Sequence, residues 1–120
     1  MTSGVEVPPD HIDQSSSRPG GTLMASRCPD GHSTAYPPLE RCPACWTATE
    51  RVALSGSGRL YSFSTVAVVP GAPYTIGYVD TPEGARIFAH LTTSEADLRP
   101  DQPVQLRLAD GRATWEASNA

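Results

Sequence analysis

Four potential metal ligands constrain this sequence more than any other feature. Cys28 is followed by His32, and after nine intervening residues Cys42 and Cys45 form a C-x-x-C pair with a proline after its first cysteine. A turn of this kind points two thiolates and several backbone N–H groups at one ion. Three thiolates and one imidazole form an established structural zinc set, and soft ligands favour zinc over magnesium or calcium. We therefore predict one structural Zn²⁺ held by Cys28, His32, Cys42 and Cys45.

The first half of this motif departs from the commonest spacing. Gly31 stands where a second cysteine would complete a C-x-x-C pair, and His32 lies one position further on. The longer imidazole side chain can cover the extra residue, so a C-x₃-H element is geometrically workable. Two alternatives stay open: a vestigial knuckle with free, partly buried thiols, and a redox-active pair at Cys42 and Cys45. The redox pair would need a strand–helix–strand context, which the sequence lacks.

The amino-acid composition indicates a small β-rich protein. Apolar residues make up only 38% of the 120 residues, whereas proline (12) and glycine (10) are abundant. This mixture disfavours long helices and suits short strands joined by turns. A chain this short buries a small fraction of its surface, and such scaffolds usually need a staple or a partner. We expect both here.

The first 22 residues differ from the rest of the chain. Residues 1–22 are rich in Ser, Pro and Gly without hydrophobic periodicity, so we expect a flexible leader, with a partner-bound arm as the alternative. They lack the charged start and apolar core of a signal peptide, and no apolar run approaches a membrane span. We therefore expect a cytoplasmic protein with no membrane partner. Thiols stay reduced there, so three cysteines favour metal over disulfides.

The pattern of residues 51–118 predicts a barrel that follows a ribbon formed by residues 23–50. Five β-rich runs are bounded by turn residues, and Ser94 with the acids after it predicts a helix of one or two turns between the third and fourth runs. Five strands with a short helix in this position form the OB architecture. The predicted strands are Leu60–Val69, Tyr74–Val79, Arg86–Leu91, Val104–Leu108 and Ala113–Ala117.

The charge of the chain argues against a nucleic-acid partner. The formal net charge is −4, and residues 51–120 carry six Arg against seven acidic residues. Nucleic-acid binders normally show a basic balance. Six barrel aromatics could stack on bases, as in OB folds that bind single strands, but strand alternation favours a core position for most of them. These aromatics are Tyr61, Phe63, Tyr74, Tyr78, Phe88 and Trp115.

No residue of the sequence is assigned a catalytic role. His90 lies in a predicted strand, where a lone histidine is more often packed or exposed than a base, and His11 lies in the leader. Gly56-x-Gly58 precedes a strand rather than a helix, so it is not a dinucleotide-binding fingerprint. Without a nucleophile, a base and a group that orients the base, we expect that the chain is not an enzyme on its own.

These motifs, in this order, resemble the zinc-ribbon/OB-fold family called "domain of unknown function 35", over about residues 23–118. The resemblance implies a mostly β fold: an N-terminal rubredoxin-like zinc ribbon followed by a five-stranded OB-fold barrel with one short helix. The family usually has four Cys ligands, which map onto Cys28, Cys42 and Cys45, whereas Gly31 fails the match. The matching motifs are Tyr36-Pro37-Pro38, Cys42-Pro43-x-Cys45, Gly56-x-Gly58-x-x-Tyr61-Ser62-Phe63 and Leu98-Arg99-Pro100-x-x-Pro103-Val104.

The resemblance also implies a function. Members of this family are accessory subunits of thiolase-superfamily proteins, which include thiolases, acyltransferases and aldolases that act on acyl-CoA substrates. The small chain packs on the large one and helps shape its acyl or CoA channel, while the large subunit supplies the nucleophile. For this chain the resemblance implies a thiolase-fold partner, with a CoA- or carrier-linked acyl substrate at the shared interface. A single-stranded nucleic-acid-binding OB protein and an independent small enzyme are the alternatives.

Overall fold

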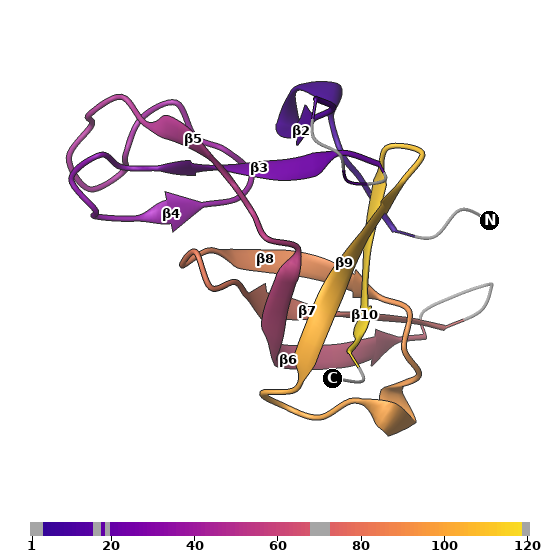
Figure 1. Cartoon of the computed structure of the whole chain (residues 1–120). Coiled ribbons are helices and arrows are strands. Elements are labelled where there is room, and N and C mark those ends of the chain that lie inside the picture. Colours follow the sequence, from indigo (N-terminus) through magenta and orange to yellow (C-terminus); the bar gives the residue numbers. More distant parts are fainter. Residues whose placement is uncertain (1–3, 16–17, 19, 68–72, 119–120) are drawn as a thin grey trace.

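A small sheet and a β-barrel lie next to each other in the computed structural model, which describes residues 4–15, 18, 20–67 and 73–118 (Figure 1). The first half of the chain contributes β1 (Val5–Glu6), the 3₁₀ helix η1 (Pro9–His11), β2 (Ile12–Asp13), β3 (Thr22–Arg27), β4 (Thr34–Ala35) and β5 (Glu50–Ala53). The second half contributes β6 (Ser57–Val66), β7 (Tyr74–Asp80), β8 (Arg86–Leu91), the 3₁₀ helix η2 (Glu95–Asp97), β9 (Pro103–Ala109) and β10 (Arg112–Ala117).

The barrel closes in the strand order of an OB fold. β6, β7 and β8 pair as an antiparallel meander, and β10 joins the far side of β8 in parallel through Trp115 and Leu91. β9 pairs with β10 and returns to β6, so the ring runs β6-β7-β8-β10-β9. This arrangement confirms the predicted five-stranded OB-fold barrel. β1 also pairs antiparallel with the first two residues of β10.

All five predicted strands are present, and the bounds of β8 are those predicted. β6 begins at Ser57, three residues earlier than predicted, and Val68 and Val69 lie outside the described residues. The predicted helix is a single 3₁₀ turn, and the Ser94 side chain accepts no capping hydrogen bond from a backbone N–H of this turn. Leu98 then adopts an extended conformation and is buried, which ends the turn. Neither three-residue helix of the described chain could cross a bilayer.

The small sheet, called the ribbon below, is built around β3. β3 pairs antiparallel with β2, β4 and β5. β3 was not predicted from the sequence, because both of its faces are covered and its residues do not alternate between apolar and polar. The ribbon also shares one hydrophobic cluster with the barrel. Its most buried members are Leu23 and Ala25 of β3, Leu54 of the connection, and Leu60, Val79, Ala89, Val104 and Trp115 of the barrel.

The leader differs from the expected flexible segment in its described part. Val5 and Glu6 pair with β10, Val7 is buried, and Ile12 and Asp13 pair with β3. The apolar side chains of this segment therefore pack on the fold, which composition alone did not reveal. The limits between leader, ribbon and barrel at residues 22/23 and 50/51 stay a prediction.

The expectation that most barrel aromatics belong to the core is wrong. Trp115 is buried and Phe63 packs against the core, but the other four side chains are about half exposed. Tyr61 sits at a β-bulge between Leu60 and Ser62, and a bulge re-aims its extra side chain. Since β6 comes this close to β7 beside the bulge, a Cβ on Gly77 would lie 2.2 Å from the carbonyl oxygen of Ser62.

Candidate metal centre

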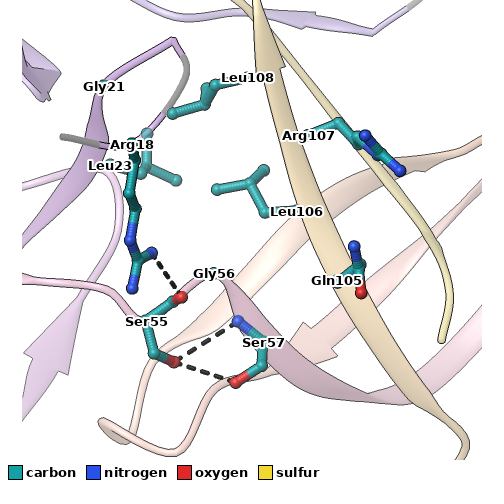
Figure 2. A pocket seen from close by; sticks show the side chains of 10 residues that line it. All are labelled: Arg18, Gly21, Leu23, Ser55, Gly56, Ser57, Gln105, Leu106, Arg107 and Leu108. Atoms are coloured by element: carbon teal, nitrogen blue, oxygen red, sulfur yellow. Dashed lines mark hydrogen bonds between the residues drawn. The ribbon is translucent and has the colours of Figure 1, made fainter. Parts of the chain in front are cut away.

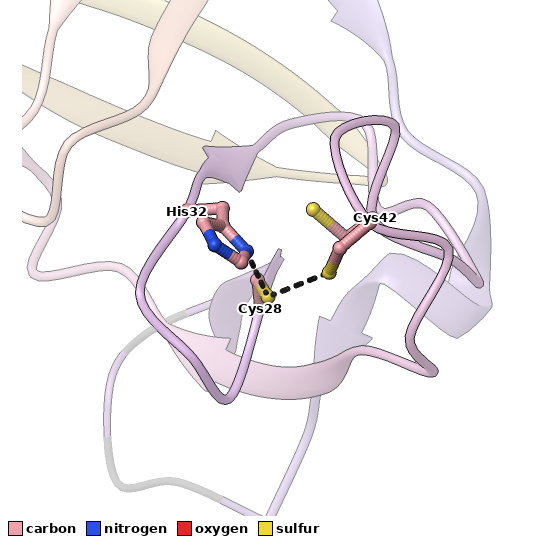
Figure 3. Close-up of side chains that lie close together, drawn as sticks. Cys28, His32 and Cys42 are labelled. Carbon is pink, nitrogen blue, oxygen red and sulfur yellow. Dashed lines mark hydrogen bonds between the residues drawn. The ribbon is translucent and has the colours of Figure 1, made fainter.

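The four predicted ligands lie in two tight loops at one end of the ribbon. Cys28 directly follows β3, and His32 lies in the same loop before β4. Cys42 and Cys45 lie in the loop between β4 and β5. All three cysteines are free thiols. Figure 3 shows the side chains of Cys28, His32 and Cys42 converging from these two loops.

The ligand atoms form a compact group. One atom from each of Cys28, His32, Cys42 and Cys45 lies within 4.8 Å of all the others. Cys28 Sγ is 3.4 Å from His32 Nδ1 and 3.7 Å from Cys45 Sγ. In a tetrahedral zinc site, neighbouring sulfurs lie about 3.8 Å apart and a sulfur lies about 3.5 Å from a nitrogen. The measured separations therefore fit one ion of this size, with the soft donors that zinc prefers.

The two loops repeat one backbone pattern. The N–H of Cys28 donates to the carbonyl oxygen of Ser33, and the N–H of Cys42 donates to that of Thr47, each at 2.9 Å. The sequence carries this repeat as Cys-Pro-x-x-x followed by Ser or Thr, a signal that was not used in the prediction. Each loop is therefore a self-contained knuckle that presents its first cysteine in the same way.

The knuckles differ in the residue that takes the left-handed conformation. In the second knuckle that residue is Trp46 (φ 61°), directly after the predicted ligand Cys45. In the first knuckle it is Gly31 (φ 80°), one position earlier, and His32 follows it. The earlier turn brings position 32 to the cluster in place of position 31. The structure thus gives a backbone reason for the C-x₃-H spacing.

Hydrogen bonds to sulfur favour the thiolate form in the second knuckle. The Thr47 side chain, with its hydroxyl 3.3 Å from the sulfur, lowers the pKa of Cys45. Burial alone would raise the pKa of Cys42, but the Ala44 N–H, which donates to its Sγ at 3.4 Å, and the Ser33 hydroxyl bring it below the usual value. Thiolates are the metal-binding form, so the knuckle is prepared for a cation.

Cys28 shows the opposite shift. The backbone of His32 lowers the pKa of Cys28, but burial and the two neighbouring sulfurs leave it raised overall. Cys28 and Cys42 are buried, whereas His32 and Cys45 are exposed. The cluster is therefore closed towards the ribbon and open to solvent on the other side, where a chelator can reach it.

We expect Trp46→Gly to stabilise the ribbon. The left-handed conformation costs an L-residue about 1–2 kcal/mol, and the Trp46 side chain is 72% exposed, so its removal loses little packing. Glycine also raises the conformational entropy of the unfolded chain, which cancels about 0.4–1 kcal/mol of this stabilisation. The net gain should raise the Tm of the metal-loaded protein by a few degrees in a thermal melt. Trp46→Ala is the control and should change it little; a lower Tm for the glycine variant alone would contradict the interpretation.

The other histidines have structural surroundings. His90 Nδ1 accepts a hydrogen bond from the Gly4 N–H at 2.5 Å, and its ring packs edge-on against Tyr74. His11 packs edge-on against Tyr36, with its Nδ1 3.5 Å from the Tyr36 hydroxyl. Both imidazole rings therefore pack against a tyrosine ring, which fits the packing role that the sequence favoured for His90.

A cavity of about 400 Å³ lies where the ribbon meets the barrel (Figure 2). Arg18 donates there to the carbonyl oxygens of Ser55 (2.5 Å) and Leu54 (3.4 Å), and Arg107 pairs with Glu116. Arg18 and Arg107 therefore both have partners within the chain. We interpret the cavity as part of the contact between the ribbon and the barrel. Its lining residues are Arg18, Gly21, Leu23, Ser55, Gly56, Ser57, Gln105, Leu106, Arg107 and Leu108.

One family profile and several known proteins are similar to this chain in sequence. The family profile described as "ChsH2, C-terminal OB-fold domain" matches residues 51–109. The benzoylsuccinyl-CoA thiolase subunit BbsA of Thauera aromatica is 35% identical over 108 residues, which cover 87% of this chain and 75% of that protein. A DUF35 domain-containing scaffold protein of Methanocaldococcus jannaschii is 35% identical over 86 residues, which cover 66% of this chain and 58% of that protein.

A solved structure, the Ltp2-ChsH2(DUF35) aldolase, contains a chain with the same fold. The TM-score is 0.67 at 22% identity, and the match covers 80% of this chain and 84% of that chain. At this identity the likeness concerns the fold alone.

Proposed function

The chain belongs to the DUF35 family of zinc-ribbon/OB-fold proteins, and from this premise we propose that it is a non-catalytic accessory subunit of a thiolase-type enzyme. One observation carries the proposal: the chain spans 75% of a protein named as a thiolase subunit, at 35% identity. We propose further that it stabilises a thiolase-fold subunit of a thiolase, acyltransferase or aldolase. It would then also help shape the channel for a CoA- or carrier-linked acyl substrate.

The side-chain chemistry of the described chain supports a non-catalytic role. Acyl transfer requires a nucleophile with a positioned base. Cys28 and His32 are in contact and could form such a pair of nucleophile and base, but both belong to the proposed ligand cluster. Its sulfur and nitrogen are both needed to complete a four-ligand set. The nucleophile in the proposed assembly therefore comes from the partner subunit.

The proposed role of zinc is structural. Cys28, His32, Cys42 and Cys45 would hold the ion and leave no position for a substrate, as in closed zinc sites. A bound Zn²⁺ would supply a cross-link between the two knuckles. The ribbon, whose loops have few apolar residues of their own, would then keep β3 in place against the shared core.

A single-stranded nucleic acid fits the chain less well. Exposed aromatics on β7 and β8 would suit base stacking, which is the observation in favour of this alternative. However, the charge of the barrel half gives no basic track, with six Arg against seven acidic residues in residues 51–120. Affinity for nucleic acid depends largely on neutralising phosphates.

The test of the proposed function is co-expression with a thiolase-fold chain encoded near the gene. We expect a stable complex that buries about 1,600 Å² or more, and turnover of acyl-CoA substrates only when both chains are present. Size-exclusion chromatography and a turnover assay with and without this chain measure both effects. A large subunit that is stable, monodisperse and fully active without this chain would contradict the proposal, as would turnover by this chain alone.

A further inference from the structure

Four of the six exposed large hydrophobic side chains in the described chain lie on the barrel strands β6, β7 and β8. Their exposed fractions are between 46% and 56%, and the remaining two, Leu39 and Trp46, belong to the ribbon. β6, β7 and β8 are neighbours in the barrel (Figure 1). We call the four residues the aromatic face: Tyr61, Tyr74, Tyr78 and Phe88.

The aromatic face is continuous across the strands. Tyr78 and Phe88 are cross-strand partners with ring centroids 6.0 Å apart in an edge-to-face arrangement. Tyr61 precedes Ser62, the cross-strand partner of Tyr78, and Tyr74 lies four residues before Tyr78 on the same side of β7. The strands therefore hold these rings at fixed positions on one surface of the barrel.

The area of the aromatic face suits the centre of a protein interface. A fully buried aromatic residue removes about 150–250 Å² from solvent, so four half-exposed ones leave about 400 Å² for a partner. This is as large as the largest apolar patch that a typical monomer exposes. A standard interface needs about 800 Å² per partner, with an apolar centre and a polar rim.

The arginine beside the aromatic face is paired with an acidic residue. The Arg86 guanidinium lies over the Tyr61 ring, 3.7 Å from its centroid, and binds the Asp80 carboxylate through two hydrogen bonds of 2.6 and 3.0 Å. Glu95 accepts a hydrogen bond from the Thr65 hydroxyl at the other end of the face. A phosphate backbone or an anionic membrane needs unpaired basic residues. The aromatic face offers instead an aromatic surface whose adjacent arginine, Arg86, is already paired, and aromatic residues and arginine are enriched in protein interface centres.

A recess borders one end of the face. A cavity of about 540 Å³ is lined by residues that include Tyr74, His90, Thr75 and Glu95. It opens beside the Tyr74 ring, so an apolar surface laid on the face could place one protruding side chain in it. Shape complementarity of this kind is typical of the energetic centre of an interface.

We propose that the aromatic face is the surface by which this chain binds the thiolase-fold subunit. The inference rests on the proposed function and adds the surface and the chemistry of its counterpart: a neutral, apolar patch of the large subunit with a side chain that enters the recess beside Tyr74. The ribbon then lies outside the centre of the interface.

The test measures the affinity of purified variants for the thiolase-fold subunit. The double variant Tyr78→Ser/Phe88→Ser should weaken binding at least about thirtyfold, because hot-spot residues each contribute a factor of this size. The matched control Leu39→Ser/Trp46→Ser removes the two exposed hydrophobics of the ribbon and should change binding less than threefold. Since all four side chains are exposed or half exposed, thermal melts should show that each variant stays folded.

A second measurement does not depend on the stability of the double variant. A benzoylphenylalanine at position 88 should form a photo-crosslink to the thiolase-fold subunit, identified by mass spectrometry, and the same residue at position 46 should not. If the complex tolerates the Tyr78/Phe88 changes, or if crosslinks form only from position 46, the aromatic face is not the binding surface. The proposed accessory role would be unaffected by either result. No complex with the unaltered chain overturns both.

Two further outcomes would assign another occupant and overturn the proposal. One is self-association of the isolated chain that is lost in Phe88→Ser, which would make a second copy the occupant. The other is sub-micromolar, salt-sensitive binding of a single-stranded oligonucleotide that is lost in the same variant.

Discussion

Cys42→Ala should leave the purified chain with less than about a tenth of an equivalent of zinc and should unfold the ribbon loops. Cys42 is fully buried, and its thiolate receives the Ala44 N–H, so the alanine variant removes the best-supported ligand of the site. Binding of structural zinc contributes about 10–16 kcal/mol in isolated zinc-finger peptides, and this free energy is also folding free energy. Metal analysis of untagged protein measures the first effect, and hydrogen exchange of residues 23–50 measures the second.

His32→Ala is the informative comparison for this variant. His32 is exposed and contributes a neutral nitrogen, so its loss should cost less zinc affinity than the loss of the buried thiolate. Chelation of the unaltered protein should loosen residues 23–50 before the barrel strands. An unaltered chain with well under half an equivalent of zinc, or a Cys42→Ala variant that keeps a full equivalent, would contradict the assignment of this site.

Trp115→Ala should lower the Tm by about 12 °C or more and leave the barrel largely unfolded at physiological temperature. Trp115 is 1% exposed and joins the barrel at its closing point, opposite Leu91 on β8 and Leu106 on β9. Replacing a buried tryptophan with alanine costs about 3–5 kcal/mol, which is a large share of the stability of a small domain. Each kcal/mol shifts the Tm of such a domain by about 4–8 °C.

The chain contains its own control for this experiment, because it has two tryptophans. Trp46→Ala removes the same side chain from a position that is 72% exposed, and it should change the free energy of unfolding by less than about 0.5 kcal/mol. Thermal and urea denaturation of both variants give the comparison. Similar losses of stability in the two variants would show that the barrel core does not depend on Trp115.

The barrel strands could be predicted because their signals are local. Turn residues bound each run, and the predicted limits of the run Arg86–Leu91 matched the structure. The four potential ligands could be grouped because cysteine and histidine spacing reflects the reach of a knuckle. Both signals lie within short stretches of sequence, where backbone geometry determines them.

The features that were missed depend on distant parts of the chain. β3 is covered on both faces, so buried residues follow one another in its sequence and carry no alternation. The outward direction of Tyr61 depends on a bulge in β6, and the room for that bulge comes from Gly77 on β7. The choice between core and surface for the aromatics was therefore decided by strand pairing, which the sequence pattern of a single strand does not contain.

The different turns of the two knuckles link positions 31 and 32 in the evolution of this chain. A cysteine at position 31 would have open space around its Cβ, but it would inherit a φ of 80° that suits glycine. A change at position 32 alone would remove one member of the ligand set. Each single step away from Gly31-His32 is therefore unfavourable, whereas a joint change that also moves the left-handed residue restores a C-x-x-C knuckle. We expect the two positions to covary among relatives, with glycine at 31 accompanied by histidine at 32.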